Sequence, residues 1–208
     1  MTRVLMLMLG LLSGSVAAQP RAGTEEAGVG PDASGRPSLW VQPVLPFMGL
    51  ALTTLSGQRY FGLPVGWNQP VRPTRDLVFE LTPLVMPHAL SLYAAVGHAW
   101  RLRPDASGGG LFLHLKGGGA LSAETRDVVP GRSPWGAQAS LGLDVGYRFQ
   151  HGRFFLDMLL GLNAGVSFGF SSPLSSLGVG LYAPLTREGT RWLFVEPNLH
   201  LLRLGVRL

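Results

Sequence analysis

Cysteine is absent from this 208-residue chain, and Lys116 is its only lysine. The lack of cysteine excludes disulfides, thiolate metal sites, a cysteine nucleophile and a lipidated N-terminal cysteine. Charged residues amount to only 14% of the sequence, and the 17 basic residues are scattered rather than gathered on one segment. That scatter argues against nucleic acid as a partner. Beyond the N-terminus, no run approaches the roughly 18 apolar residues that a membrane-spanning helix requires.

Apolar residues are nonetheless abundant, at 46% of the chain, and they alternate with small or polar residues over many stretches. Alternation with a period of two is typical of β-strands that have two unlike faces. The 29 glycines and 16 prolines also disfavour long helices. The sequence therefore predicts an all-β fold in a single domain that follows an N-terminal extension.

The first residues have the organisation of a secretory signal peptide, which we place at residues 1–18. Arg3 supplies the positive charge, Val4–Leu12 form the apolar core, and small residues lead to a cleavage site. A retained membrane anchor is the alternative, although a core of about nine residues is too short to span a bilayer. Residues 19–38 are rich in glycine, proline and alanine without periodicity, so we expect a disordered tail before a barrel at residues 39–208.

The clearest structural signal is a long β-hairpin over residues 137–170. Odd-numbered residues of its first arm and even-numbered residues of its second arm are almost all apolar, while small or polar residues fill most intervening positions. Between the arms, the sequence suits a two-residue turn centred on His151 and Gly152, because primed turns require positive φ. This turn predicts a register that places Tyr147 opposite Leu156.

The same alternation predicts an antiparallel up-and-down barrel of eight strands. These strands are expected at residues 39–55, 58–67, 76–86, 89–103, 110–124, 136–150, 153–170 and 190–208. The last strand changes parity, which one extra residue in a β-bulge at Leu201–Leu202 would accommodate. A ninth alternating stretch, Ser176–Leu185, is expected to form a protruding arm of the last loop, because single-chain bacterial barrels have even strand numbers; ten strands are the alternative.

The polar faces indicate whether the apolar faces meet lipid or a soluble core. They consist of small residues and a few charges, which suits a narrow barrel interior, whereas a soluble barrel would carry lysine, glutamate and threonine outside. Aromatic residues fall near both strand ends: Trp100, Tyr147, Phe149 and Phe154 at one, Trp135, Phe168 and Phe170 at the other. Phe154 and Phe168 are separated by roughly 35 Å along a membrane normal. They would bracket an apolar band of about 25 Å, so we expect a transmembrane barrel.

The hairpin also carries a recognisable set of residues: Gly142, Gly146, Tyr147, Phe149, Gly152, Arg153, Phe154, Leu156, Asp157 and Gly161. In these residues it resembles a family of small, mostly uncharacterised bacterial outer-membrane β-barrel proteins. The resemblance implies an eight-stranded barrel in the bacterial outer membrane, with both termini in the periplasm. Such barrels usually end in an aromatic residue, whereas this chain ends in Leu208. The expected partners are outer-membrane lipid and, during insertion, the barrel-assembly machinery.

No catalytic, metal or cofactor residues are assigned from motifs. The five histidines lack metal-ligand spacing, and none is followed two positions later by serine, the pairing that outer-membrane lipid A deacylases carry. The polar faces instead predict a lumenal polar cluster of five residues: Asp144, Arg148, Asp157, Glu196 and His200. In the predicted register Asp157 is diagonal to Arg148, which fits a lumenal ion pair and also two separately solvated charges.

We therefore expect an integral outer-membrane barrel that is structural or binds a ligand or surface, and that is not an enzyme. Two alternatives stay open. Glu196 and His200 share a predicted lumenal face, which would suit the acid–base chemistry of a lipid-modifying barrel enzyme. With the faces inverted, the chain would be a soluble ligand-binding barrel of the lipocalin type. The sequence names neither a ligand nor an oligomeric state.

Overall fold

The computed structural model describes residues 35–87, 89–104, 108–124, 135–169, 181–185, 191–198 and 201–208. All of them belong to one compact unit that begins at Pro31. The predicted signal peptide and nearly all of the predicted tail lie outside the described residues. No helix among the described residues has the length and apolar character needed to cross a membrane.

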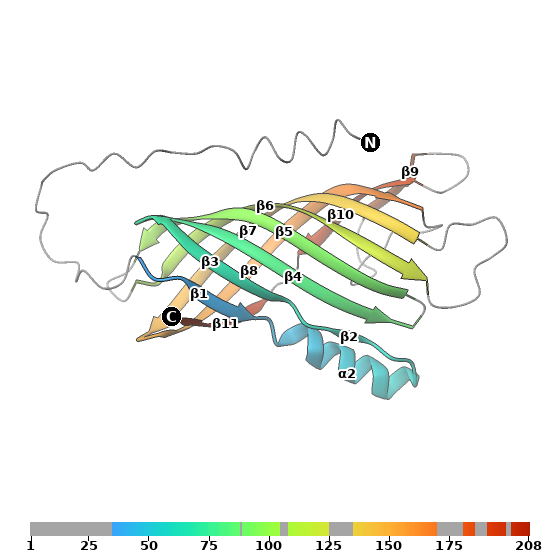
Figure 1. Ribbon diagram of the computed structural model, residues 1–208, viewed down its shortest axis with the longest axis horizontal. Coiled ribbons are helices and arrows are strands. Elements are labelled where there is room, and N and C mark those ends of the chain that lie inside the picture. The colour runs from blue at the N-terminus through green and yellow to red at the C-terminus, as the bar shows by residue number, and fades with distance from the viewer. Residues whose placement is uncertain are drawn as a thin grey trace, which may run out of the picture. The chain divides into compact units, whose positions relative to one another are not determined.

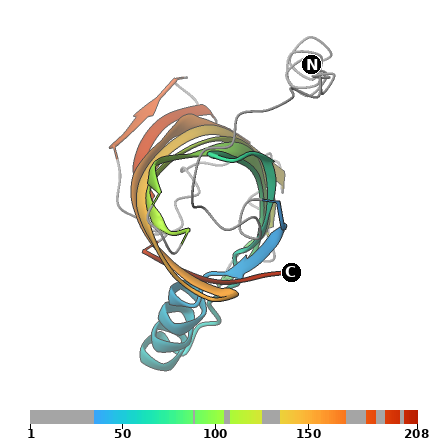
Figure 2. The ribbon, with the colours of Figure 1, turned by 90° about the vertical axis from the view of Figure 1, so that its left-hand side faces the viewer.

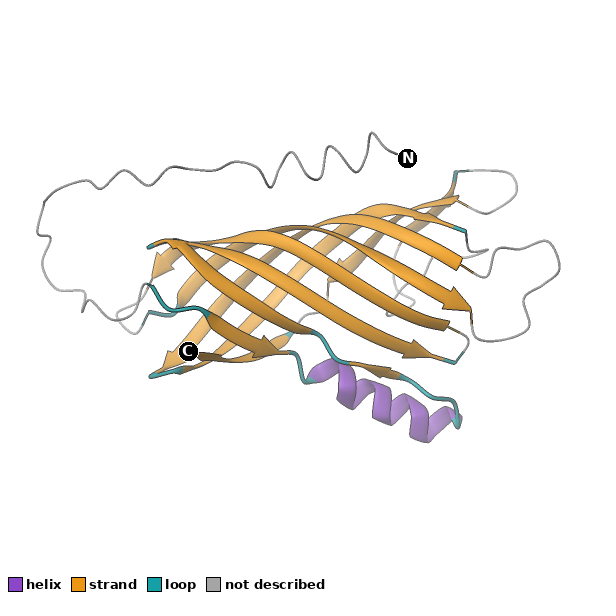
Figure 3. Ribbon diagram, viewed as in Figure 1, coloured by secondary structure: helices purple, strands orange, loops and turns teal. Residues whose placement is uncertain are grey.

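The secondary structure is almost entirely β, with one helix near the start of the described chain (Figures 1 and 3). The elements are β1 (Ser38–Val41), α2 (Val44–Ser56), β2 (Phe61–Gly62), β3 (Val65–Arg72), β4 (Arg75–Met86), β5 (Ala89–Pro104), β6 (Gly110–Glu124), β7 (Trp135–His151), β8 (Phe154–Phe168), β9 (Leu181–Pro184), β10 (Arg191–Asn198) and β11 (Leu202–Arg207). The all-β prediction is thereby confirmed.

The strands form one antiparallel sheet that closes into a barrel-like ring, which Figure 2 shows end-on. The ring runs in the order β1-β3-β4-β5-β6-β7-β8-β11 and returns to β1, so the predicted eight-stranded up-and-down arrangement is confirmed. β10 and β11 pair with successive halves of β8 and therefore act as two parts of one strand. β2 and β3 likewise pair with successive parts of β4.

The two faces of the ring differ sharply in chemistry. On β7, Leu141, Leu143 and Val145 point outward and are 67%, 48% and 48% exposed. Between them in sequence, inward-facing positions carry buried residues such as Asp144, which has no exposed surface. Polar groups thus fill the inside and aliphatic groups cover the outside, as the alternation of side chains along each strand requires.

The β7–β8 hairpin is present, but the predicted register is wrong by two residues. His151 pairs with Phe154, so the two central turn residues are Gly152 and Arg153. Gly152 has φ of 57°, and among the described residues only glycines have positive φ. A turn with glycine at its first central position is of the II′ type, whereas the predicted turn would have required positive φ at His151. The pairing therefore places Tyr147 opposite Met158 rather than Leu156.

The predicted strand at residues 39–55 is wrong beyond Val41. The chain leaves the ring at Pro43 and forms α2, because Pro43 and Pro46 cannot donate to a ladder and Pro46 falls in the first helical turn, where no donor is needed. The following leucine, methionine and alanine residues favour a helix. Gly57, with φ of 69°, ends it by donating its N–H to the Thr53 carbonyl.

The end of the chain confirms the predicted change of parity. Asn198 pairs with Gly161 and Leu202 pairs with Met158, so this strand advances four residues while β8 advances three. The extra residue returns the apolar side chains to the outer face, as a bulge does. β9 pairs only with β10 and lies outside the ring, as expected of a protruding arm; residues 176–180 of the predicted stretch lie outside the described residues.

We expect disulfide trapping to report the corrected register, because the chain contains no cysteine that would compete. In the double variant Val145→Cys/Leu160→Cys the two residues are directly opposite, at a Cα separation of about 4.5–5.5 Å that a disulfide can bridge. In Val145→Cys/Met158→Cys they are diagonal, about 7–8 Å apart. Mild oxidation should consume both thiols only in the first variant, as counted by maleimide labelling after unfolding. Preferential oxidation of the second pair would restore the register predicted from sequence.

Candidate functional site

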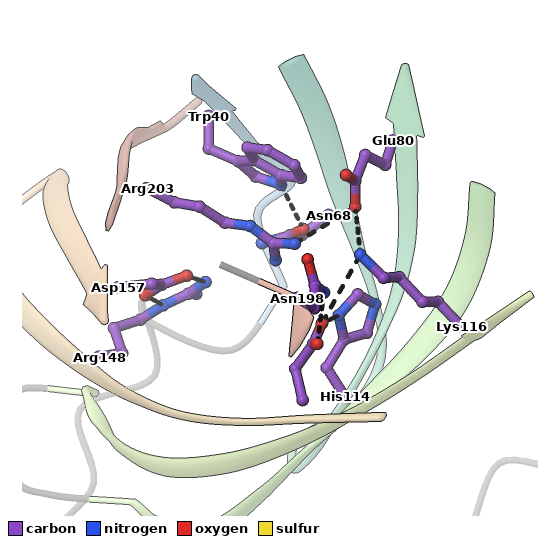
Figure 4. Close-up of polar contacts among 10 residues, drawn as sticks. Trp40, Asn68, Glu80, His114, Lys116, Arg148, Asp157, Asn198 and Arg203 are labelled. Carbon is purple, nitrogen blue, oxygen red and sulfur yellow. Dashed lines mark hydrogen bonds and ion pairs between the residues drawn. The ribbon is translucent and has the colours of Figure 1, made fainter. Parts of the chain in front are cut away.

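Half of the charged residues that the structure describes are buried inside the ring. Those that are at most 9% exposed are Asp76, Glu80, Lys116, Asp144, Arg148, Asp157, Glu196, Arg203 and Arg207. Figure 4 shows two groups of contacts among these residues, one around Lys116 and one made by Arg148 and Asp157. Buried charges are tolerated when opposite charges and hydrogen bonds compensate them. The interior is therefore a candidate site whose first property is charge pairing.

Lys116 lies between two carboxylates at the centre of the ring. Its Nζ is 3.2 Å from Glu80 Oε2 and 3.7 Å from Asp144 Oδ2, and its side chain is 1% exposed. Glu80 belongs to β4, Lys116 to β6 and Asp144 to β7. The only lysine of the chain thus joins three strands across the interior.

Glycines on intervening strands create the space for these contacts. Lys116 pairs with Gly97 of β5, which separates it from β4, and a Cβ on Gly97 would lie 2.8 Å from the Lys116 Cβ. Asn198 of β10 reaches Asp144 of β7 past Gly161 of β8 in the same way. In each case the strand between the partners carries no side chain at the crossing point. Partners two strands apart can therefore form a direct contact.

Asp144 is the most connected acid of this group. Its carboxylate accepts a hydrogen bond from Asn198 Nδ2 and lies 3.1 Å from His114 Nδ1, besides its contact with Lys116. His114 is directly opposite Asp144 on β6 and is 1% exposed. Its Nε2 has no hydrogen-bond partner among the described residues. The arrangement holds the imidazole in one orientation through the Asp144 carboxylate.

Arg203 extends the group to the other side of the ring. Its Nη2 lies 3.3 Å from Glu80 Oε2, and its guanidinium carbon lies 4.0 Å from the centre of the Trp40 ring. Trp40 is 2% exposed and donates a hydrogen bond of 3.0 Å from Nε1 to Asn68 Oδ1. A cation over an indole face is stabilised by the ring quadrupole. β11 and β1, the strands that close the ring, are thereby tied to β3 and β4.

Arg148 and Asp157 form a separate bidentate ion pair. Arg148 Nε and Nη2 donate to the two carboxylate oxygens of Asp157 at 2.6 and 2.7 Å. The guanidinium also lies 3.9 Å from the centre of the Phe155 ring. The corrected register places these two residues directly opposite rather than diagonal, which favours the predicted ion pair over two separately solvated charges. Nearby, Arg101 Nη2 contacts Asp76 at 3.0 Å.

Four of the five residues of the predicted lumenal cluster are buried in the interior: Asp144, Arg148, Asp157 and Glu196. They do not form one cluster, because Asp144 belongs to the group around Lys116 while Arg148 and Asp157 pair with each other. His200 lies outside the described residues.

The prediction missed several charged or polar partners that complete these contacts: Glu80, His114, Lys116, Asn198 and Arg203. One signal for them was available in the sequence. Each lies at a position of inward parity on its strand, as the predicted cluster residues do.

A cavity of about 120 Å³ lies in the interior next to α2. Residues of β4 to β8 and of β10 line it, and Glu80, Glu196 and Asn198 contribute to its wall. The group around Lys116 therefore separates this cavity from the Arg148–Asp157 pair. Within the described ranges no group of three or more histidines and acids is arranged to hold a metal ion.

The Arg148–Asp157 pair allows a test of how the buried charges stabilise the fold. We expect Asp157→Leu to lower the free energy of unfolding by about 3–5 kcal/mol, because it leaves Arg148 buried without its carboxylate. Arg148→Met/Asp157→Leu should recover most of that loss, since it removes both charges together. Urea unfolding followed by tryptophan fluorescence measures both variants. A double variant as unstable as the single one would show that the contribution is packing rather than charge pairing.

Comparisons with known proteins do not assign the chain to a family. No family model, no curated protein and no solved structure matches it. The resemblance of the hairpin to small outer-membrane barrels therefore stays a prediction. The geometry of the ring, its filled interior and its apolar exterior are the features that bear on function.

Proposed function

We propose that this protein is an integral β-barrel of the bacterial outer membrane, structural or ligand-binding rather than enzymatic. The observation that carries the proposal is the distribution of side chains, apolar outside and charged inside. Water disfavours a continuous apolar surface of this extent, whereas lipid favours it. Where β1 and β11 close the ring, the backbone hydrogen bonds of the strands are satisfied internally, as a membrane-spanning structure requires.

The outward surface supports this assignment around the whole ring. Exposed aliphatic side chains occur on every strand from β4 to β8, with examples at Leu81, Leu92, Leu115, Leu143 and Leu160. α2 adds Phe47, Leu50 and Leu55, which are 71%, 64% and 85% exposed, and it contains no charged residue. A helix of this composition would be poorly soluble on a water-exposed surface. In the proposal it lies against lipid beside the barrel.

The dimensions are compatible with a bilayer. β8 extends from Phe154 to Phe168, and both aromatic side chains are exposed at its ends. Fifteen residues at a tilt near 40° span roughly 35 Å along the barrel axis. Trp135 is 65% exposed at the start of β7, near the Phe168 end of β8. Aromatic residues at both edges of an apolar band are typical of outer-membrane barrels.

The turns suggest an orientation. The β3–β4 and β7–β8 turns are short and lie at the same end of the ring as the C-terminus (Figure 1). At the opposite end β6 stops and β7 begins, with ten residues between them in the sequence. Bacterial barrels place short turns in the periplasm and long loops outside. The short-turn end would therefore face the periplasm. Outer-membrane lipid and, during insertion, the barrel-assembly machinery would be the partners.

The filled interior favours a role other than general permeation. Lys116, Glu80, Asp144 and Arg203 meet across the ring, and eight-stranded barrels leave little more than the volume of their own side chains. The filled interior therefore fits a structural or ligand-binding role. The enzymatic alternative pairs Glu196, which is buried in the interior, with His200, which lies outside the described residues.

Membrane extraction and heat modification test the proposed location. Expressed in a diderm host, the full chain should fractionate with the outer membrane and require detergent for extraction. Folded barrels resist unfolding by dodecyl sulfate at room temperature, so unheated and heated samples should migrate at different positions on a gel. Recovery as a soluble periplasmic protein with identical migration before and after heating would support the soluble lipocalin-type alternative and exclude the proposal.

A charge placed at two depths gives a second test. Leu160, near the middle of β8, is 63% exposed, and Phe154, at its end, is 70% exposed. In a bilayer, Leu160→Arg should reduce the free energy of unfolding by about 2–4 kcal/mol and Phe154→Arg by only about 0–1 kcal/mol. Reversible urea titrations of vesicle-inserted protein measure the difference. On a soluble barrel both sites would face water, and neither substitution would change stability by more than about 0.5 kcal/mol.

A further inference from the structure

Among the described residues, strand pairing continues all the way around the ring at only one of its ends. β1 closes it by pairing with β3 and β11, but β1 ends at Val41. Beyond Val41, β2 pairs only with β4. On the other side of the interruption, β10 pairs with β8, and the part of β10 up to Val195 also pairs with β9. No ladder joins β2 to β10 among the described residues. We call this interruption of the wall the seam.

α2 covers the seam on the side of β2. A Cβ on Gly49 of α2 would lie 2.8 Å from the Tyr60 carbonyl oxygen, and Leu45 packs against Gly62 of β2. Proline occupies the wall on both sides, at Pro64 and Pro197, so these positions present no unpaired N–H. Each proline removes one N–H group that would otherwise be unpaired, which lowers the free-energy cost of exposing these strand edges to lipid.

The cavity described above extends from the interior to the seam. Its outer part is apolar and includes Val44, Leu45 and Met48 of α2 and Leu84 and Met86 of β4. Its inner part is polar and includes Ser140 and Glu196. One space thus joins the polar interior to the apolar surface beneath α2. This gradient suits a molecule that has both a polar and an apolar end.

The inner part offers hydrogen-bond acceptors and lacks positive charge. Two of its described lining residues, Glu80 and Glu196, are acids, and none is lysine, arginine or histidine. Asn163 Oδ1, which is an acceptor, and Thr82 Oγ1, a hydroxyl that can donate or accept, have no hydrogen-bond partner among the described residues. The acidic lining disfavours an anionic head group. A head group that donates hydrogen bonds and carries no negative charge therefore fits this part of the cavity.

We propose that the seam admits an amphiphile whose head group donates hydrogen bonds and lacks negative charge, such as a hydroxyl-bearing or amine head group. The head group occupies the cavity near Thr82 and Asn163, and the chain leaves along Leu45, Met48 and Leu84 to the surrounding lipid. The cavity, at about 120 Å³, accommodates a head group rather than a whole lipid. The site rests on the proposed membrane location and adds a ligand class to it.

Because the chain lacks cysteine, Ser140→Cys provides a single reporter thiol inside the cavity. The variant is placed in phosphatidylcholine nanodiscs, and its reaction with a small water-soluble thiosulfonate is timed with dodecyl glucoside, dodecylamine or dodecanoate present. At about ten times the dissociation constant, the glucoside or the amine should slow labelling about tenfold, and dodecanoate should not. Protection by one donor head group alone would identify which of the two the site takes. His151→Cys, exposed at the short-turn end, should react at one rate throughout.

Two second-site variants test the geometry. Asn163→Leu removes an acceptor and should weaken protection by the donor head groups, while Ala120→Phe fills the cavity and should make labelling insensitive to every amphiphile. Equal protection by dodecanoate, no protection at all, or a thiol that never reacts would overturn the ligand proposal. Heat modification is recorded on the same samples. Its absence would refute the membrane location, whereas its presence with unprotected thiol refutes only the ligand site.

Discussion

The structure depends on the pairing of charges inside a ring too narrow to solvate them. The buried acids Asp76, Glu80, Asp144 and Asp157 each contact a cation of another strand, through Arg101, Lys116, Arg203 or Arg148. Removing either member of such a pair leaves a buried charge, so the strands must keep the register that brings the partners together. The apolar outer surface cannot specify that register alone, because a shift of two residues leaves every aliphatic side chain outside. We therefore attribute the choice among equal-parity registers to the interior charges.

Glycine makes this pairing possible across strands that are not neighbours. In a ring whose inner face is crowded, a side chain normally blocks the line between partners two strands apart. Gly97 and Gly161 remove that obstacle at the Lys116–Glu80 and Asn198–Asp144 contacts. A glycine also makes room for a large side chain, since the Phe155 ring occupies the space where a Cβ of Gly205 would lie. The glycine content thus reflects the volume of the partner side chains as well as the demands of turns.

The parts of the fold that follow from local patterns could be predicted from sequence, and the parts set by contacts between distant strands could not. Alternation correctly placed β4 to β8 and the parity change near Leu202, because one strand contains all the necessary information. The predicted hairpin register was wrong because parity allows shifts of two residues. Both the positive φ of Gly152 and the Arg148–Asp157 ion pair favour the observed register. Arg148 and Asp157 were identified because both lie on one hairpin. Glu80 and Arg203 are 123 positions apart, and only closure of the ring brings them together.

The same closure explains why the seam lies where it does. β1 and β11 are short, yet they complete the wall at the level where Arg203 and Trp40 connect them to Glu80 and Asn68. Fewer buried charges lie at the end of the ring next to α2. At that end Pro43 directs the chain out of the wall, and no ion pair of the group around Lys116 is lost. Opening the ring at the other end would instead separate β11 from β8, where Arg203 lies opposite Asp157. The distribution of buried charge thus fits a ring whose seam lies at the end away from the Arg148–Asp157 pair, next to the cavity under α2.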